Sequence, residues 1–229
     1  MINPEHIKQF YNQNQFPGHY TKVDLSYHED HIKNAYLSLI DQQLTVGSHI
    51  LDLGCGTGLI SNLFAGKYPD CQFTGIDFSD AVDYADNYAK LHGITNVTYK
   101  KQDVLQFDTG TQFDIVICQG VLHHIPMYAD AIEKIKLLVK PGGTLIVGLY
   151  HPNGKLLKKI VNIDYKNKQL EIDQELVPYE TSFLCSRVKS MFRPFVLVDS
   201  YPKIGFLTAI KAIFNYRNGG LITYVFKKL

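Results

Sequence analysis

The stretch ILDLGCGTGLI, residues 50–60, decides the fold of this 229-residue chain. A short apolar run leads into a loop with glycines at positions 54, 56 and 58, and a helical pattern follows directly. Glycines permit positive φ angles and let a ligand approach bare backbone, while a helix N-terminus offers N–H groups to an anionic group. The spacing is G-x-G-x-G, with Leu59 where the dinucleotide-binding pattern G-x-G-x-x-G has its third glycine. We therefore expect a strand, a loop and a helix that together bind a ligand.

Short apolar runs alternate with helical patterns on both sides of this loop. The runs predict strands at 49–54, 72–77, 96–101, 113–119 and 144–150, and helices at 28–44, 58–68, 79–93 and 126–139. Ser79 is the expected N-cap of the third helix, and Pro141-Gly142-Gly143 is expected to close the fourth. Single helices between apolar strands favour a parallel sheet covered on both faces, with right-handed crossovers. The expected fold class is α/β with a doubly wound sheet.

The remaining sequence predicts further strands at 195–201 and 221–228, a helix at 207–217 and a turn at 218–220. Residues 151–194 have a mixed helix and loop pattern. No internal repeat separates these segments, so we expect a single domain over residues 1–229.

Composition excludes several classes of protein. With 45% hydrophobic residues and a net charge of +1 the chain is not disordered, and no apolar run reaches the roughly 20 residues that cross a bilayer. The four cysteines have no metal-binding spacing, so we expect no metal and a reduced, cytoplasmic location. The formal charge of residues 1–150 is −6, and that of residues 151–229 is +7. That basic last third could face an anionic substrate, or its lysines could simply be solvated.

Two acids follow predicted strands at positions where a nucleoside binds in such sheets. Asp77 ends the 72–77 strand, and a carboxylate at that tip can accept bonds from both hydroxyls of a ribose. The alternative role, capping the next helix, is already filled by Ser79. Asp103 follows the third strand and can accept a bond from the exocyclic amine of an adenine.

Together these residues resemble the class I S-adenosylmethionine-dependent methyltransferases. The motifs are LDLGCGTG, GIDFS, QDV, FDIVICQGVLHHI and LLVKPGGTLIVGLY, in that order, over residues 45–150. The resemblance implies S-adenosyl-L-methionine as cofactor and a Rossmann-like, seven-stranded, mostly parallel sheet whose last strand, residues 221–228, is antiparallel. It divides the chain into N-terminal lid helices (1–45), a cofactor-binding core (46–150), a substrate cap inserted after strand five (151–194) and the last strands (195–229).

The resemblance also implies which residues bind the cofactor. The glycines line its methionine and ribose, Asp77 holds the ribose diol, Phe78 flanks the adenine, Asp103 and the Val104 backbone read the adenine edge, and Gln119 lies near the methionine amino group. The expected set is completed by Asp52 and Cys55 of the glycine motif and by Tyr20 of the lid. The full set is Asp52, Gly54, Cys55, Gly56, Gly58, Asp77, Phe78, Asp103, Val104, Gln119 and Tyr20.

Three residues are candidates for catalysis. His123 and His124 follow strand four at the carboxyl edge of the sheet, where an imidazole could take a proton from an acceptor. The alternative is a hydrogen-bonded loop histidine. Tyr11, in the aromatic N-terminal segment, either contacts cofactor or acceptor or packs a helix onto the sheet. His151 after strand five has the same two interpretations as the histidine pair.

The function that follows is methyl transfer to oxygen or nitrogen of a small acceptor, and an anionic acceptor is one candidate. Arg187 and Arg193 in the insertion are candidates for binding an acceptor carboxylate or phosphate. CQGV stands after strand four in place of the (N/D)PP(Y/F) tetrapeptide of DNA-type amine methylation. The alternatives are a tRNA or protein methyltransferase, with nucleic acid not favoured because no appended binding module is present, and a non-catalytic cofactor-binding protein. The oligomeric state stays open.

Overall fold

The computed structural model describes residues 4–20, 35–152, 178–204 and 220–229. Within them, seven strands form one sheet in the order β3-β2-β1-β4-β5-β7-β6. The strands are β1 (His49–Leu53), β2 (Gln72–Asp77), β3 (Val97–Lys101), β4 (Phe113–Gln119), β5 (Val139–Tyr150), β6 (Val196–Tyr201) and β7 (Leu221–Lys227). All pairs from β3 to β5 are parallel, and β7 runs antiparallel to both of its neighbours. This order confirms the expected doubly wound, mostly parallel sheet with an antiparallel last strand.

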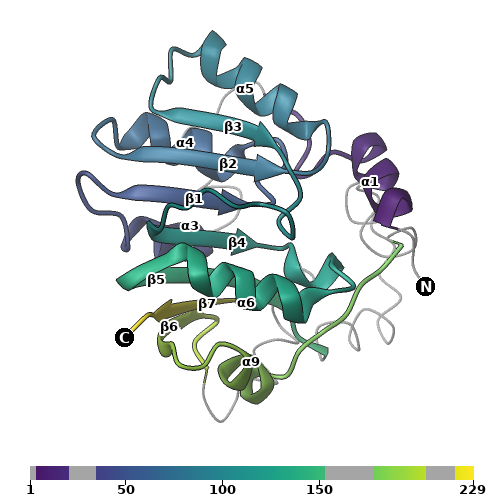
Figure 1. The fold of residues 1–229 in the computed structure, drawn as a ribbon. Helices are drawn as coiled ribbons and strands as arrows, with labels where there is room; N and C mark the ends of the chain where they lie inside the picture. The colour runs from purple at the N-terminus through teal and green to yellow at the C-terminus, as the bar shows by residue number, and fades with distance from the viewer. Residues whose placement is uncertain (1–3, 21–34, 153–177, 205–219) are drawn as a thin grey trace.

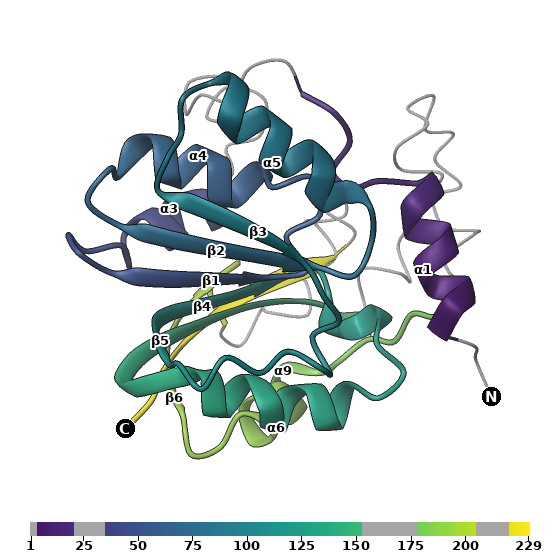
Figure 2. The same cartoon turned by 45° about the horizontal axis from the view of Figure 1, so that its top comes forward.

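Helices cover both faces of the sheet (Figures 1 and 2). The helices α3 (Ala35–Asp41), α4 (Leu59–Lys67) and α5 (Ala81–Leu91) lie on one face, and α6 (Tyr128–Leu138) and α9 (Cys185–Met191) lie on the other. A short 3-10 helix, η1 (Leu122–His124), follows β4. The helix α1 (Pro4–Gln13) stands beyond the carboxyl ends of the central parallel strands. The ends of β1, β2 and β4 therefore face an N-terminal element.

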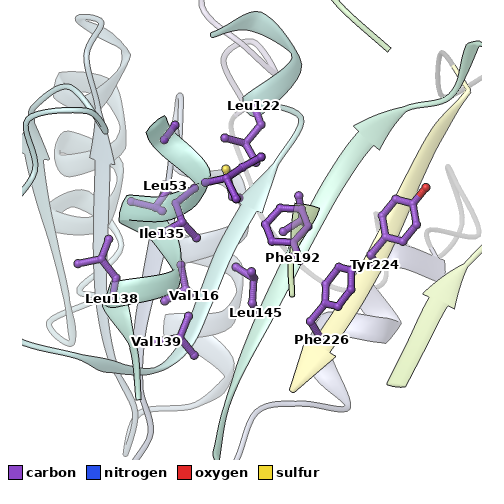
Figure 3. Close-up of a cluster of buried hydrophobic side chains, with 14 of the residues drawn as sticks. Leu53, Val116, Leu122, Ile135, Leu138, Val139, Leu145, Phe192, Tyr224 and Phe226 are labelled. Carbon is purple, nitrogen blue, oxygen red and sulfur yellow. The ribbon is translucent and has the colours of Figure 1, made fainter. Parts of the chain in front are cut away.

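The alternation of side chains along the strands builds a core on each face. On β1, Leu51 and Leu53 point into the cluster under α6 and α9, while Ile50 points into the cluster under α3, α4 and α5. Figure 3 shows the first cluster, where Leu53 and Ile135 lie close together. Because both faces are buried, the central strands β1, β4 and the second half of β5 have runs of consecutive buried residues rather than an alternation of buried and exposed ones.

The last strand joins β6 to the rest of the sheet. It pairs with β5 from Thr144↔Lys227 to Tyr150↔Leu221, and with β6 on its other side. Tyr224 and Phe226 of β7 are buried, and the Phe226 ring lies 5.1 Å from that of Phe192, which follows α9 (Figure 3). The β7 strand thus packs against the insertion that follows β5.

Three predicted boundaries are wrong. The strand β5 begins at Val139, so Pro141-Gly142-Gly143 belongs to the strand and does not form a separate turn. The N–H of Gly142 donates to the Lys228 carbonyl, and the N–H of Lys228 donates to the Gly143 carbonyl, which joins this stretch to the chain after β7. The helix α6 begins at Tyr128, near Pro126 as predicted, but it ends at Leu138 and β5 follows at once, so no turn closes the helix.

The third corrected boundary is the start of α5, where Asp80 and not Ser79 occupies the N-cap position. The Ser79 hydroxyl donates to the Asp77 carboxylate at 2.7 Å, and it also accepts the N–H of Ala81 at 3.3 Å. The Ser79 hydroxyl therefore binds the Asp77 carboxylate at the end of β2 as well as the first N–H of α5. The predicted helix at 207–217 and the first part of the 28–44 helix lie outside the described residues.

Candidate functional site

The glycine loop after β1 is held against the end of β2 and against η1. The N–H groups of Gly54 and Cys55 both donate to the Ile76 carbonyl, at 2.8 and 3.0 Å. Gly54 has φ +70°, and a Cβ there would lie 2.4 Å from Cγ2 of Val121 at the start of η1. A larger residue would therefore push the loop after β4 away from the loop after β1, so this glycine keeps the two ligand-facing loops in contact.

Asp77 connects the glycine loop to the start of α5. Its Oδ2 accepts the N–H of Gly56 at 2.9 Å, and its Oδ1 accepts the N–H and hydroxyl of Ser79 at 2.9 and 2.7 Å. Burial raises the pKa of this carboxyl, and the bonds from Ser79 and Gly56 oppose the rise. A carboxylate has about four acceptor positions. Gly56 and Ser79 supply three donors, and the N–H of Phe78 also interacts with this carboxylate. The glycine loop and the residues after β2 therefore hold the Asp77 carboxylate in place.

The N-terminal segment lies directly on the glycine loop. The Phe16 carbonyl accepts the N–H of Thr57 at 3.0 Å, and a Cβ on Gly56 would lie 2.1 Å from that same carbonyl. The Tyr20 hydroxyl donates to the Thr57 carbonyl at 2.6 Å and accepts from Nδ2 of Asn62 at 3.0 Å. The structure thus places Tyr20, an expected cofactor-binding residue, where its hydroxyl fastens the N-terminal segment to the loop.

The helix α1 brings Tyr11 between two parts of the site. The Asn12 side chain accepts the N–H of Asp80 at 2.8 Å, which fixes α1 against the loop after β2. The Tyr11 ring centroid then lies 6.0 Å from that of Phe78 and 5.9 Å from that of His124. Tyr11 therefore links the side chain expected beside the adenine to the histidine pair.

The two histidines of η1 are buried in an aromatic cluster at the end of β4 and β5. The His123 ring lies 4.2 Å from the His124 ring and 4.0 Å from the Tyr150 ring. We call residues 179–183 the strap, because they cross this cluster within the insertion, just before α9. Within the strap, the N–H of Thr181 donates to the His123 carbonyl at 2.8 Å, and the Tyr179 carbonyl lies 3.1 Å from Nδ1 of His124.

Sequence reasoning missed Tyr150 and the strap. Tyr150 lies at the carboxyl end of strand five, next to the candidate His151, and this position could have pointed to it. Aromatic residues are common at strand ends, so the position alone did not single it out. His151 is buried next to Tyr150, and its burial lowers the pKa of its imidazole. No sequence pattern could show that residues 179–183 return to η1, because that contact depends on the path of the insertion.

Asp52 and Cys55 lie beneath the loop. The Ser61 hydroxyl of α4 donates to the Asp52 carboxylate at 2.7 Å. Burial, opposed by this bond and assisted by the charge of Asp77, raises the pKa of Asp52 to about 7. Cys55 is buried, and burial raises the pKa of its thiol. Both side chains contact the protein interior, which suits support of the loop.

The other expected cofactor residues are placed as follows. Oδ1 of Asp103 accepts the N–H of Leu105 at 2.8 Å, and Val104 belongs to the buried cluster of Figure 3. Nε2 of Gln119 donates to the Thr223 hydroxyl on β7 at 2.9 Å. The Gln119 side chain crosses Gly148 to reach it, since a Cβ at Gly148 would lie 2.4 Å from Oε1 of Gln119. The structure therefore turns the Gln119 amide along the sheet toward β7.

The two candidate arginines lie on the surface of the α9 region. The Arg187 guanidinium donates to the Tyr128 hydroxyl of α6 at 3.0 Å, and both Arg187 and Arg193 are exposed. Within the described residues, no group of three or more His, Cys, Asp or Glu side chains could hold a metal ion. The described helices include none with the length and apolarity to cross a membrane.

The strand order and the glycine loop held by an acid at the tip of β2 define the Rossmann-like class of S-adenosylmethionine-dependent methyltransferases. Residues 44–182 match a family model described as a methyltransferase domain. The chain belongs to this methyltransferase family, whose cofactor is S-adenosylmethionine.

Curated relatives match the same part of the chain. A ubiquinone biosynthesis O-methyltransferase of Coxiella burnetii is 37% identical over 133 residues, which are 56% of this chain and 56% of that protein. The (S)-coclaurine N-methyltransferase of Papaver somniferum is 31% identical over 137 residues, 59% of this chain and 39% of that protein. The chain thus matches about half the length of the first relative and less of the second.

Solved structures share the fold over nearly the whole chain. The magnesium protoporphyrin IX methyltransferase of Synechocystis PCC 6803, solved with S-adenosylhomocysteine, has a TM-score of 0.67 at 16% identity and covers 99% of this chain and 100% of that one. The N-methyltransferase NodS of Bradyrhizobium japonicum WM9 has a TM-score of 0.62 at 17% identity and covers 97% and 98%. These likenesses confirm the fold class.

Proposed function

We propose that this protein transfers the methyl group of S-adenosylmethionine to an oxygen or nitrogen of a small-molecule acceptor. One observation carries the proposal. The Asp77-held glycine loop and the His123–His124–Tyr150 cluster lie at the same edge of the sheet, with Tyr11 in ring contact with both Phe78 and His124. A cofactor site and an acceptor site must adjoin in this way, because methyl transfer is an in-line displacement.

Some of these residues would bind the cofactor, and others would orient the reactants. Asp77 at the tip of β2 is the proposed partner of the ribose hydroxyls, and Phe78 and Asp103 adjoin it at the ends of β2 and β3 for the adenine. The cofactor supplies an activated methyl group on a sulfonium. Aromatic rings near a cation contribute roughly 0.5–2 kcal/mol, and alignment of the reactants can contribute on the order of 7–11 kcal/mol. We assign these two purposes to Tyr11 and Tyr150, whose rings flank the histidine pair.

The names of the relatives support a small acceptor. The two curated relatives described above act in ubiquinone biosynthesis and on coclaurine by their names, so both O- and N-methylation occur among proteins similar to this chain. An anionic acceptor group would be bound by Arg187 or Arg193, both of which are exposed. A cytoplasmic location is part of the proposal, supported by free cysteines at all four positions.

Two measurements test the proposal. Calorimetric titration of the purified protein with S-adenosylmethionine should show saturable binding, and the absence of any binding would refute the function. Incubation with cofactor labelled in the methyl group and with fractionated cell extract should label a low-molecular-weight fraction. Label in tRNA or protein, with a steep loss of binding at high salt, would instead support the macromolecular alternative.

A further inference from the structure

Three residues on neighbouring strands, Gln119, Gly148 and Thr223, form what we call the polar row of the sheet. Gln119 of β4 is paired with Gly148 of β5, and Gly148 is paired with Thr223 of β7. Paired residues in adjacent strands lie on the same face of a sheet. The row directly below is apolar and buried, and it consists of Ile117, Ile146 and Val225. This face of the sheet therefore changes from apolar to polar where β4 ends.

A hydrogen bond holds the Gln119 amide across the polar row. Nε2 of Gln119 donates to the Thr223 hydroxyl oxygen at 2.9 Å, and the missing side chain of Gly148 makes room for the amide between the two strands. An amide oxygen has two acceptor positions, and the Thr223 hydroxyl, 3.4 Å from Oε1 of Gln119, takes at most one of them. Thr223 is buried, whereas Gln119 is partly exposed. Oε1 of Gln119 is thus held where it can accept a further hydrogen bond.

The polar row lies on the side of the site away from the residues proposed to bind the nucleoside. Asp77 ends β2 and the glycine loop follows β1, whereas the polar row spans β4, β5 and β7, the next three strands of the sheet. Tyr150 stands two residues beyond Gly148 on β5 and therefore on the same face. Because the Tyr150 ring also contacts His123, the polar row adjoins the cluster at which the acceptor molecule is proposed to bind.

We infer that Gln119 and Thr223 form a subsite for the acceptor molecule, and that this subsite binds a hydroxyl or N–H group separate from the methylated atom. The inference rests on the proposed function and deepens it. Gln119 makes the contact through Oε1, and Thr223 is a positioning residue that acts through Gln119. The resemblance to other methyltransferases predicted Gln119 beside the methionine of the cofactor. The direction of its amide, over β5 toward β7 and away from the glycine loop on β1, assigns it to the acceptor molecule instead.

Recognition at this subsite depends on the hydrogen bond that the amide oxygen accepts. An acceptor molecule with a hydroxyl or N–H group at this place satisfies the oxygen, whereas one without such a group would cover it and leave it unpaired. Without the Thr223 hydroxyl the Gln119 side chain is free to adopt other rotamers, so part of the binding free energy is lost in ordering it. The loss belongs to binding of the acceptor molecule and not to binding of the cofactor.

The test titrates the acceptor molecule without requiring its identity. The low-molecular-weight fraction of cell extract supplies the acceptor molecule, and cofactor labelled in the methyl group is kept saturating. Thr223→Val removes the hydroxyl and keeps a branched side chain of similar size. We expect the half-saturating amount of extract to rise about 10-fold or more. The rate at saturation and the KM for S-adenosylmethionine should each change less than about 3-fold.

Two further threonine variants control for the loss of a buried hydroxyl. Thr223→Ser keeps the hydroxyl and should behave like the wild type. Thr144→Val removes the side-chain hydroxyl of another buried threonine, which lies at the opposite end of the pairing between β5 and β7. Its half-saturating amount of extract should stay at the wild-type value.

A double-mutant cycle tests whether Thr223 acts through Gln119. Gln119→Met keeps the length of the side chain and removes its amide, so it should raise the half-saturating amount by a similar factor. Two residues that act through one contact have non-additive effects. The double variant should therefore be no worse than Gln119→Met alone, and additive losses would overturn the inference.

Other results would also overturn the inference. A loss of S-adenosylmethionine affinity of about 10-fold or more in Thr223→Val, measured by calorimetry, would return Gln119 to the methionine of the cofactor. Wild-type values in Thr223→Val, or an equal rise in Thr144→Val, would contradict the subsite. The labelled product of the wild-type protein should contain a hydroxyl or N–H group besides the methylated atom, and a product with neither would contradict it as well.

The wild-type reaction separates this inference from the proposed function. If the wild type binds S-adenosylmethionine and labels the low-molecular-weight fraction while Thr223→Val does so equally well, the subsite fails and the function stands. If the wild type binds no S-adenosylmethionine, or labels only macromolecules, the proposed function itself fails.

Discussion

Asp77 illustrates how one carboxylate can organise a site before any ligand arrives. Its two oxygens use three of their acceptor positions on Gly56 and Ser79. In Asp77→Asn, one oxygen becomes an NH₂ group, so a donor faces a donor in a buried place, which costs about 1–3 kcal/mol. We expect S-adenosylmethionine affinity to fall at least about 10-fold by calorimetry. Asp70→Asn, in the exposed turn before β2, should bind like the wild type.

Asp52 predicts an unusual dependence of stability on pH. Burial raises its pKa in the folded protein to about 7, so the folded state holds a proton that the unfolded state releases. The free energy of unfolding should therefore decrease as pH rises from about 4 to about 7, by on the order of 1.4 kcal/mol per pKa unit. Asp52→Asn should lose this dependence, as measured by urea denaturation across that range.

Asp114 is the matched control, because its shift has the opposite sign. Partial burial works to raise its pKa, but the bonds from Lys140 and from the N–H of His49 outweigh it and lower the pKa. The ionised Asp114 carboxylate stabilises the folded protein at pH values above its unfolded pKa. This stabilisation is lost as the pH falls through its lower pKa in the folded protein. Asp114→Asn should therefore change the acid side of the profile. Identical profiles for both variants would contradict the assignment to Asp52.

At the residue scale, sequence reasoning identified the residues at the edge of the sheet but not the directions of their side chains. The glycines and Asp77 were predictable because a strand, a loop and a strand tip determine their positions. Gln119 was expected near the methionine amino group, yet its amide bonds to Thr223, which is 104 residues away in sequence. Such a partner depends on β7 lying next to β5, which no local pattern reveals.

At the scale of elements, the N-terminal segment is held against the glycine loop through the Phe16 carbonyl. Gly56 has φ +53°, and a Cβ there would meet the Phe16 carbonyl at 2.1 Å. Gly56→Ala therefore adds a steric clash to backbone strain of about 1–2 kcal/mol. We expect a lower melting temperature and faster proteolysis within residues 14–20.

Gly110→Ala provides the control for strain alone. Its φ is +61°, and a Cβ there would meet no atom within 4 Å. This variant should lose stability without exposing residues 14–20 to protease. If both variants show the same proteolysis, the lid is not held through Gly56.

The boundaries of elements were less predictable than their existence. Pro141-Gly142-Gly143 has the composition of a turn, but the backbone groups of Gly142 and Gly143 pair with Lys228, which follows β7. Tertiary hydrogen bonds thus override local preference. In the same way, Ser79 has the composition of an N-cap, while its hydroxyl is directed to Asp77.

At the scale of the molecule, the apolar strands predicted the sheet and its two covered faces. They could not specify that the last strand inserts between β5 and β6. Phe226 of this strand is fully buried and contacts Phe192. Phe226→Ala should lower the free energy of unfolding by about 3–5 kcal/mol in denaturant titrations. Val198→Ala on the exposed side of β6 should cost less than about 1 kcal/mol.

The position of β7 has a consequence for synthesis on the ribosome. The strand β6 precedes β7 in sequence, yet it joins the sheet through β7. While the chain emerges, β5 has an open edge and β6 has no neighbour in the sheet, so both expose backbone groups that other nascent chains could pair with. Translation of residues 221–227 closes this gap, and a chaperone that shields strand edges would act before that moment.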